Sequence, residues 1–522
     1  METRKEILLL FGLLFALNSL VQAQEKSIRE ELQELRERTR MQNEILGKPN
    51  SITLPAQEAI QQKKQEEEKY EIIFRRNEIP ILNQSKNKKW SLEECIQYAI
   101  NQNINIKQLQ LQQELAGIQQ NTAKNSRLPN LNASMEQEWN FGRIQDLLGE
   151  FNDRNQSRTS FNAQSIVPIF TGFRIPNQVE RTKFDFHAAT QDLEKAKEDL
   201  SLNITFLFLQ VLLNKELYNI SVEQLELVET QVERTILLVE AGNVPKFQLY
   251  DIEAQVAKDS VTVIEAQNYL DLALLDLAQS LELERNTDFD IYIPNIEGDI
   301  ISIFSKSLQP PDIIYENAIN FKPVIKGQEY RVESSRKALK VAESGYYPQI
   351  DFLLGIGTNY YHVFKPSEQI NPITNEPMVL NHSFPDQIRN YGARLFGFNM
   401  SIPVFNRYQV RNQVSSAKID ILNQQLILEN NKKTLYKEIQ TAYKNATAAQ
   451  EKYRASWRAV KASSESFEYA RRRYELGSAT VFEFNEARTR FIQSQSEQAQ
   501  AKYEYILRTK ILDFYNGIPI KL

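Results

Sequence analysis

Two very long stretches of the chain contain neither glycine nor proline, and they constrain the fold more than any other feature. They cover residues 177–241 and 404–476. Apolar side chains recur in them three and four positions apart, as at Leu225, Val228 and Val232, which is the periodicity of an amphipathic helix. A helix of roughly sixty residues is about 90 Å long at 1.5 Å per residue. That length predicts coiled-coil packing or a barrel of helices.

A glycine follows each long stretch, and a second helical pattern begins shortly after it. Gly242 precedes residues 246–283, and Gly477 precedes residues 480–515. Glycine can end a helix by taking a left-handed conformation. Each pair of segments therefore predicts two antiparallel helices that meet at a tight tip.

The chain consists of two halves built on one plan. Pro168 in SIVPIF and Pro403 in SIPVF are 235 residues apart, and so are Gly242 and Gly477. The phenylalanines that follow the two glycines, in VPKFQ and TVFE, keep the same offset. Three pairs at one offset, in the same order, indicate an internal duplication.

Four segments between the helices predict strands, two in each half, at about residues 129–142, 158–170, 348–363 and 391–405. NLNASMEQEWNFG alternates apolar and polar residues, and only Gln137 breaks the alternation. Phe396, Phe398 and Met400 share one face of the fourth segment. Each strand has about the 9–11 residues that a tilted strand needs to cross an outer membrane.

Four strands are too few to close a transmembrane barrel, because known barrels need at least about eight. An open edge in lipid would also leave backbone groups without hydrogen-bond partners. If the strands cross a membrane, the barrel must be shared among chains, and three chains would supply twelve strands. The alternative is a small soluble sheet that caps a coiled coil. Aromatic residues near the strand ends favour the membrane interpretation, as an interfacial girdle: Trp139, Phe141, Tyr360, Tyr361 and Tyr391.

The N-terminal residues are typical of a secretory signal peptide. Arg4 and Lys5 precede an apolar run over residues 7–17, and Ala23 fits the small-residue cleavage pattern. A membrane anchor is the alternative, although the run is short for one.

These features predict six segments. They are a signal peptide over residues 1–23, a charged helical extension over 24–89, a first repeat over 90–284, an insert over 285–310, a second repeat over 311–517 and a tail over 518–522. Each repeat opens with a shorter helical segment, at residues 91–125 and 311–343, and we expect the second to break near Pro323. The extension is either a solvated helical arm or a belt around the helices.

Composition excludes several kinds of site. Cys95 is the single cysteine, so no intramolecular disulfide exists. The three histidines, at positions 187, 362 and 382, lack metal-ligand spacing, and no cofactor motif is present. The net charge of −5 argues against a nucleic-acid surface.

The sequence resembles the TolC family of outer-membrane efflux proteins over residues 90–517. WSLEECIQYAINQNINIK is similar to the opening helix of the family and its asparagine-rich turn. SRLPNL and GYYPQI resemble the helix-to-strand prolines, and SIVPIFTGFR and SIPVFNRYQ the strand-to-helix exits. The most specific match is the second tip with its return helix, which begins GSATVFEFNEARTRF.

The resemblance implies a mainly α-helical homotrimer with a transmembrane β part. Long antiparallel hairpins would form a periplasmic α-barrel, and four strands per chain would contribute to a 12-stranded β-barrel in the outer membrane of a Gram-negative bacterium. The tips would close the tunnel and meet a periplasmic adaptor, which links it to an inner-membrane transporter of the RND or ABC type. The insert would contribute to an equatorial collar. The implied work is passive export of small molecules or proteins.

The resemblance also assigns a gate near the second tip. The family carries acidic residues at six and nine positions after the tip glycine, and Glu483 and Glu486 stand there. In a trimer six carboxylates would surround one constriction, select cations, and repel one another enough to keep some protonated. Acidic residues are also favoured at any helix start, which is the alternative. Tyr474 occupies a gate position of the family, but Ala479 stands where an arginine is expected.

The two tips would dock the adaptor. The residues concerned are Ala241, Gly242, Asn243, Leu476, Gly477 and Ser478.

Two other functions compete with the duct. A secreted or periplasmic coiled-coil scaffold without a pore would leave the strand pairs and the duplicated tips unexplained. A hydrolase that used Glu483 and Glu486 would lack a nearby histidine, nucleophile or glycine-rich loop to orient a substrate, so no enzyme is expected.

Overall fold

The computed structural model describes residues 89–145, 151–153, 155–242, 244–283, 289–294, 308–364 and 382–522. All of them belong to the unit Lys86–Leu522. The signal peptide and almost all of the N-terminal extension lie outside the described residues, as do Asn243 and most of the insert. The segment boundaries given above therefore stay predictions.

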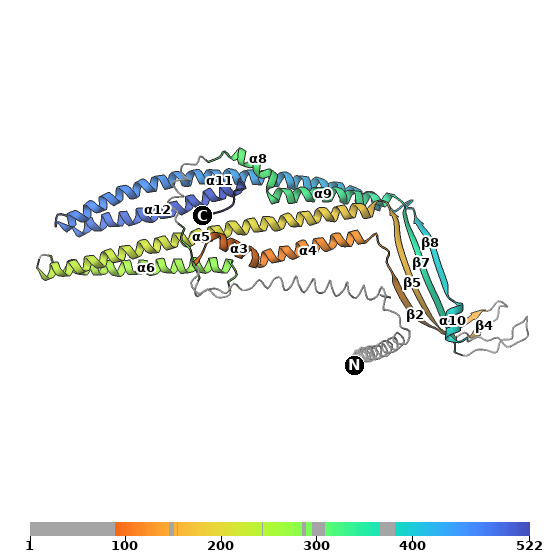
Figure 1. Ribbon diagram of the computed structural model, residues 1–522. Coiled ribbons are helices and arrows are strands. Elements are labelled where there is room, and N and C mark those ends of the chain that lie inside the picture. The colour runs from red at the N-terminus through yellow and green to blue at the C-terminus, as the bar shows by residue number, and fades with distance from the viewer. Residues whose placement is uncertain are drawn as a thin grey trace, which may run out of the picture. The chain divides into compact units, whose positions relative to one another are not determined.

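Two helices of 67 residues each dominate this unit: α5 (Arg174–Glu240) and α11 (Gln409–Glu475). At 1.5 Å per residue each is about 100 Å long. The helices α6 (Phe247–Ser280) and α12 (Val481–Tyr515) return from the glycine tips antiparallel to them (Figure 1). The predicted long antiparallel hairpins are confirmed.

Shorter helices cover the half of α5 and α11 that lies next to the sheet. They are α3 (Leu92–Gln102), α4 (Ile104–Asn125), α8 (Pro311–Phe321) and α9 (Pro323–Glu343). The first predicted segment is divided at Asn103, whose side-chain oxygen accepts hydrogen bonds from the N–H groups of Asn105 and Ile106 at 3.0 and 3.3 Å. The second is divided at Lys322, next to the proline at which we expected the break.

Four long strands form one antiparallel sheet in the order β2-β5-β7-β8. They are β2 (Asn132–Asn140), β5 (Gln156–Thr171), β7 (Gln349–Val363) and β8 (Ala393–Ser401). Beyond the sheet lie the hairpin β3 (Arg143–Gln145) with β4 (Phe151–Asp153), and the helix α10 (Phe384–Asn390). A short parallel pair joins β1 (Lys89–Trp90) to β6 (Asp290–Ile291).

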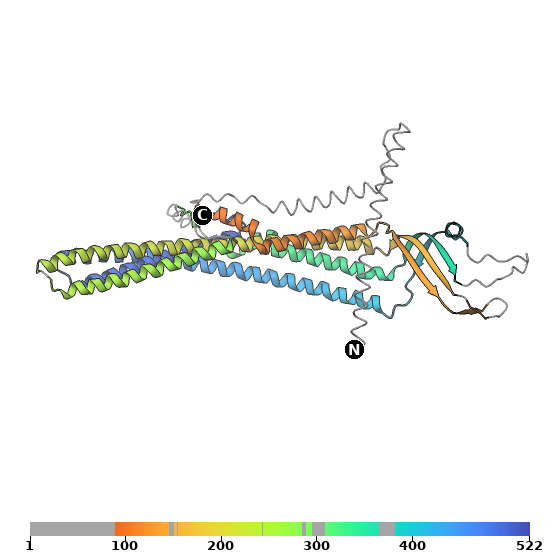
Figure 2. The same ribbon diagram turned by 90° about the horizontal axis from the view of Figure 1, so that it is seen from below.

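The helices lie in a curved layer whose order follows the order of the strands. Next to the sheet the order is α4-α5-α9-α11, and next to the tips it is α6-α5-α12-α11 (Figures 1 and 2). In both halves of the layer, α11 is one edge. The other edge is α4 near the sheet and α6 near the tips.

Two clusters of buried apolar residues lie where the shorter helices meet the long ones. One buried cluster includes Cys95, Ile204, Phe208 and Leu277, and it joins α3, α5 and α6. Burial raises the pKa of the Cys95 thiol to about 12. A second cluster joins α8 and α9 to α11 through Ile314, Ile325, Ile439 and their neighbours.

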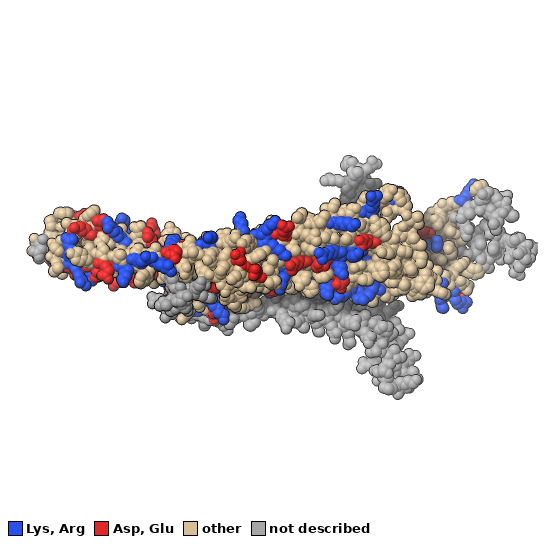
Figure 3. Space-filling model, turned by 90° about the horizontal axis from the view of Figure 1, so that it is seen from above, with Lys and Arg blue, Asp and Glu red and all other residues tan. Residues whose placement is uncertain are grey.

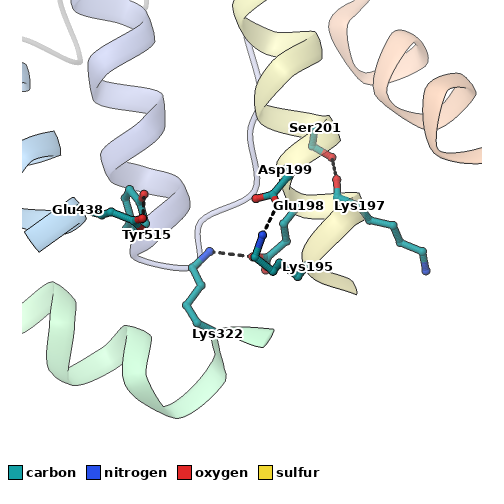
Figure 4. Close-up of polar contacts among 8 residues, drawn as sticks. All are labelled: Lys195, Lys197, Glu198, Asp199, Ser201, Lys322, Glu438 and Tyr515. Carbon is teal, nitrogen blue, oxygen red and sulfur yellow. Dashed lines mark hydrogen bonds and ion pairs between the residues drawn. The ribbon is translucent and has the colours of Figure 1, made fainter. Parts of the chain in front are cut away.

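A buried lysine ties the two repeats together. The ammonium of Lys322, at the break between α8 and α9, lies 3.1 Å from the Glu198 carboxylate on α5 and 3.3 Å from the ring centre of Phe514 on α12. Figure 4 shows it reaching toward Glu198, with the Tyr515–Glu438 hydrogen bond nearby. Burial lowers the pKa of Lys322, and the neighbouring Glu198 opposes that shift.

Candidate functional site

One face of the sheet is mainly apolar. The cross-strand register aligns apolar side chains from all four strands on it: Met135, Trp139, Phe161, Val167, Phe352, Leu354, Phe396, Phe398 and Met400. Several of them are largely exposed, and Phe398 has 73% of its surface accessible. A large exposed apolar face on a single chain indicates a surface that contacts lipid or another protein.

The opposite face carries mostly polar residues and glycines. It includes Glu136, Glu138, Arg158, Asn162, Gln164, Gly357, Gly397 and Asn399. Arg158 donates to Asn359 at 3.1 Å and lies 4.0 Å from Glu138. A sheet that is apolar on one face and polar on the other fits the wall of an aqueous pore in a membrane.

Gln137 is the one polar residue that interrupts the apolar pattern of β2. The register places Thr159 directly opposite, and its hydroxyl donates a hydrogen bond to the Gln137 side chain. Because each group satisfies the other, this amide can lie on the apolar face at little cost.

Aromatic residues lie at both ends of the strands, and the sequence identified only the set farther from the helices. In that set, the ring of Tyr361 packs against Tyr391 with centroids 5.6 Å apart. The second set lies at the helix end: Phe173, Tyr346, Tyr347, Phe405 and Tyr408, all largely exposed. Phe173 and Tyr408 are related by the 235-residue offset, and both have left-handed backbones, with φ of 64° and 61°. That offset is the signal which could have found them.

The two tips have the same geometry. Gly242 and Gly477 both have φ of 73°, a conformation that glycine adopts without strain. All the tip residues that the structure describes are exposed, and Leu476 is 83% accessible. Arg473 fastens the second tip, because its guanidinium donates to the Ser478 carbonyl at 2.8 Å and its carbonyl accepts from the Ser478 N–H.

Glu483 caps the helix that begins after the second tip. Its carboxylate accepts a hydrogen bond from the Thr480 N–H at 2.8 Å, and the Thr480 hydroxyl accepts from the Glu483 N–H at 3.2 Å. This reciprocal pair is a capping box. The hydrogen bond from the Thr480 backbone lowers the pKa of Glu483. In the single chain the pKa of Glu483 is thus lowered, whereas repulsion within a crowded ring of carboxylates would raise it.

Glu486 has a different partner. Its carboxylate lies 2.5 Å from the Arg490 guanidinium, one turn farther along α12, and both side chains are exposed. The two glutamates are therefore held separately. Tyr474 stacks on Phe484, with ring centroids 5.0 Å apart and an angle of 23° between the planes. Phe484 is buried, so Tyr474 joins the end of α11 to the start of α12.

A buried ion pair joins the second hairpin to the first, and sequence reasoning missed it. The Arg488 guanidinium on α12 lies 3.0 Å from the Asp259 carboxylate on α6, and only 2% of the arginine side chain is accessible. Gln255 donates to the same carboxylate at 2.7 Å. Within the described part of the chain, Nε and Nη1 of Arg488 have no hydrogen-bond partner. The only local indication that Arg488 is buried is its position one helical turn after Phe484, which is also buried.

A second contact between the hairpins lies closer to the tips. Arg234 on α5 donates to the Glu475 carbonyl on α11 at 3.0 Å. Its guanidinium also lies 3.9 Å from the Glu475 carboxylate. The salt bridges of Arg471 stay within α11, to Glu468 and Glu475.

The described residues contain no helix that is both long and apolar enough to span a bilayer. They contain no group of three or more His, Cys, Asp or Glu side chains placed to hold a metal ion.

Comparison with known proteins agrees with this geometry. Outer membrane protein TolC of Escherichia coli (strain K12) is 20% identical over 392 residues, which are 74% of each chain. The CmeC outer membrane channel of Campylobacter jejuni superposes with a TM-score of 0.66 at 16% identity, over 84% of this chain and 91% of CmeC. The open state of the MtrE outer membrane channel of Neisseria gonorrhoeae gives a TM-score of 0.62 at 15% identity, over 82% and 89% of the two chains.

A family model covers both repeats. The model described as "Outer membrane efflux protein" matches residues 95–282 and 314–515, which is well over half of the chain. Both matched ranges contain a tip, a long hairpin and two strands of the sheet. This chain therefore belongs to the outer membrane efflux protein family, a family of channels in the outer membrane and not of enzymes.

Proposed function

We propose that three copies of this outer-membrane efflux channel close into one duct, which crosses the outer membrane and extends through the periplasm. The observation that carries the proposal is that the two edges of the sheet can pair with each other between copies, and so can the two edges of the helical layer. Within the described part of the single chain, the edges of both the sheet and the helical layer are open, and they expose apolar side chains.

The edges of the sheet need partners. β2 and β8 are the outer strands, and each pairs on one side only. They run in opposite directions, because the sheet has four antiparallel strands. β8 of one copy can therefore pair antiparallel with β2 of the next. Closure of three copies gives twelve strands with no open edge, which a sheet in lipid requires.

The edges of the helical layer carry apolar stripes. On α4 the exposed residues are Ile104, Leu111, Leu115 and Ile118; on α6, Val261, Ile264, Leu272 and Leu275; on α11, Ile419, Leu422 and Leu426. Their spacings of three, four, seven or eight residues are those of a helix face that packs on another helix. In a ring of three, α11 of one copy would cover α4 and α6 of the next.

The duct would export solutes passively. The apolar face of the sheet would contact lipid, and the polar face would line the pore. At the other end, the exposed tips would dock a periplasmic adaptor, and through it an inner-membrane transporter of the RND or ABC type. A duct of this kind needs no catalytic group. A scaffold without a pore would not explain the two faces of the sheet.

The gate would lie near the second tip. In a threefold ring, Glu483 and Glu486 would place six carboxylates around one opening, where they would favour cations. The Arg488–Asp259 pair and the Arg234–Glu475 contact would hold the second hairpin against the first. The family has a gate arginine at the position of Ala479. In this chain, these two contacts would hold the closed gate instead.

Disulfide trapping tests the closed ring. One cysteine would replace Ala133 on β2, and a second would be placed at Arg394, Phe396 or Phe398 on β8, one position at a time. The two sites are three strand spacings apart within a chain, about 14 Å, which is too far for a disulfide. Because Cys95 is buried, it should not react. We expect oxidation to yield covalent trimers and no larger species at one or more positions. Products that continue past the trimer, or none at any position, would contradict the ring.

A further inference from the structure

At the two edges of the helical layer, the helix ends next to the sheet carry only positively charged side chains. Lys124 and Arg127 lie at the end of α4, and Arg407, Arg411 and Lys418 lie at the start of α11. The sequence contains no Asp or Glu between Glu114 and Glu136, and none between Asp386 and Asp420. Both edges are therefore basic over several helical turns.

The inner helices differ, because their basic residues have acidic neighbours. Near the sheet, Arg181 lies 3.9 Å from Asp185 on α5, and Arg336 lies 2.7 Å from Glu333 on α9. In Figure 3, positive and negative side chains are mixed along the helices, and mainly positive ones gather where the helices approach the sheet. Positive charge is therefore concentrated at the edges, and Arg174 at the start of α5 adds one more basic residue on an inner helix.

Each basic edge borders exposed apolar side chains on the strand side. Beyond α4 these are Leu128 and Leu131, which are 58% and 78% accessible. Before α11, Phe405 packs edge-to-face on Tyr408 with centroids 5.6 Å apart, and the Arg411 guanidinium lies 5.8 Å from the Tyr408 ring. Basic groups toward the helices and apolar groups toward the strands match a phospholipid, which has a phosphate above its acyl chains.

The ring proposed above would bring the two edges together. α11 of one copy would lie beside α4 of the next, so five positive charges would converge at each of three contacts. Like charges repel unless a counterion lies between them. We propose that an anionic phospholipid of the periplasmic leaflet binds at each contact, with its phosphate between the basic residues of α4 and α11 and its acyl chains along the adjoining apolar side chains. The proposal rests on the trimer.

Native mass spectrometry of the purified full-length protein in detergent tests this site. Dioleoyl phosphatidylglycerol would be added at increasing concentration, with dioleoyl phosphatidylcholine as the zwitterionic control. We expect up to three phosphatidylglycerol molecules to stay bound per trimer, and fewer phosphatidylcholine molecules at the same concentration. Added inorganic phosphate should not displace them, because it lacks acyl chains.

Two variants change one edge each. Lys124→Gln/Arg127→Gln alters α4, and Arg407→Asn/Arg411→Gln alters α11. Asparagine suits the left-handed backbone of Arg407, which has φ of 53°. Each variant should bind phosphatidylglycerol on the order of tenfold or more weakly, at about a fewfold per basic residue lost. The control Arg454→Gln/Arg458→Gln removes the same charge from the part of α11 nearer the tip and should bind normally.

The outcomes separate this proposal from the trimer. Equal binding of both lipids, or an unchanged affinity in both edge variants, would overturn the lipid site while the trimer stands. Loss in only one edge variant would contradict a site shared between copies. Displacement by inorganic phosphate would identify a free anion as the ligand instead. If only monomers appear in every lipid, the ring itself is wrong.

Discussion

At the residue scale, Glu483 has two possible roles that can be separated. Glutamine can also serve in a capping box, so Glu483→Gln removes the charge and keeps the cap. Thr480→Ala removes the threonine side of the box and keeps the charge. If the carboxylates form a cation gate, Glu483→Gln should weaken the cation selectivity of single channels, and Thr480→Ala should leave it unchanged.

The combined variant Glu483→Gln/Glu486→Gln should weaken selectivity further and relieve block by divalent cations. The same selectivity in all these variants would mean that the glutamates only start the helix. Loss of selectivity in Thr480→Ala alone would show that tip geometry, not charge, sets it.

The Glu483 cap also predicts a pH dependence. Its folded pKa is lowered by the hydrogen bond from Thr480. The carboxylate therefore adds stability above the unfolded pKa of about 4.3, and this contribution is lost as the pH falls through the folded value. The melting temperature of the wild type should exceed that of Glu483→Gln at pH 7. The difference should shrink as the pH falls below the unfolded value; a difference that stays the same at low pH would contradict this role.

We expect the largest effect of a single substitution at the buried Arg488–Asp259 ion pair. Asp259→Asn would leave Arg488 charged and buried without a counter-charge, which typically costs about 3–5 kcal/mol. We expect the second hairpin to separate more easily from the first, with a larger mean conductance and a lower denaturant midpoint.

The control for that prediction removes both charges. Replacing a buried pair with apolar residues is often close to neutral, so Arg488→Met/Asp259→Leu should recover most of the stability. If Asp259→Asn changes neither conductance nor stability, the pair does not hold the hairpins together.

At the element scale, the hairpins and strands could be predicted because their signals are local. The absence of glycine and proline over residues 177–241 and 404–476, with the glycine after each, was enough to predict both hairpins. Alternation was enough to predict the strands. The Gln137–Thr159 and Arg488–Asp259 pairs could not be predicted, because each depends on which distant segments pack together and in which register.

The two faces of the sheet give a prediction for neighbouring positions of β8. Phe398 lies on the apolar face, 5.0 Å from the ring of Phe352, and Asn399 lies on the polar face. An arginine on the lipid side of a barrel costs about 2–4 kcal/mol near the middle of the bilayer, whereas one on the pore side is solvated. Phe398→Arg should therefore lower the urea midpoint of the protein in lipid vesicles far more than Asn399→Arg does. Equal effects would mean that lipid does not contact the apolar face.

At the scale of the whole molecule, the duplication explains why one chain contains two copies of the same set of elements. Each repeat gives a long hairpin, a tip and two strands, so three chains would give a ring of six similar units. The repeats differ where function is proposed. Gln248 stands in the first repeat where the second has Glu483, and Asp259 on α6 meets Arg488 on α12. The second hairpin thus carries most of the gate, and the first hairpin supplies the contact that holds it.

The proposed duct requires a continuous pore through the assembled ring, and single-channel recording of the purified wild-type protein in a planar bilayer tests that pore most directly. We expect a small, cation-selective conductance that divalent cations block. Protein that is folded, trimeric and inserted, yet conducts no ions, would contradict the duct and leave a scaffold as the better explanation.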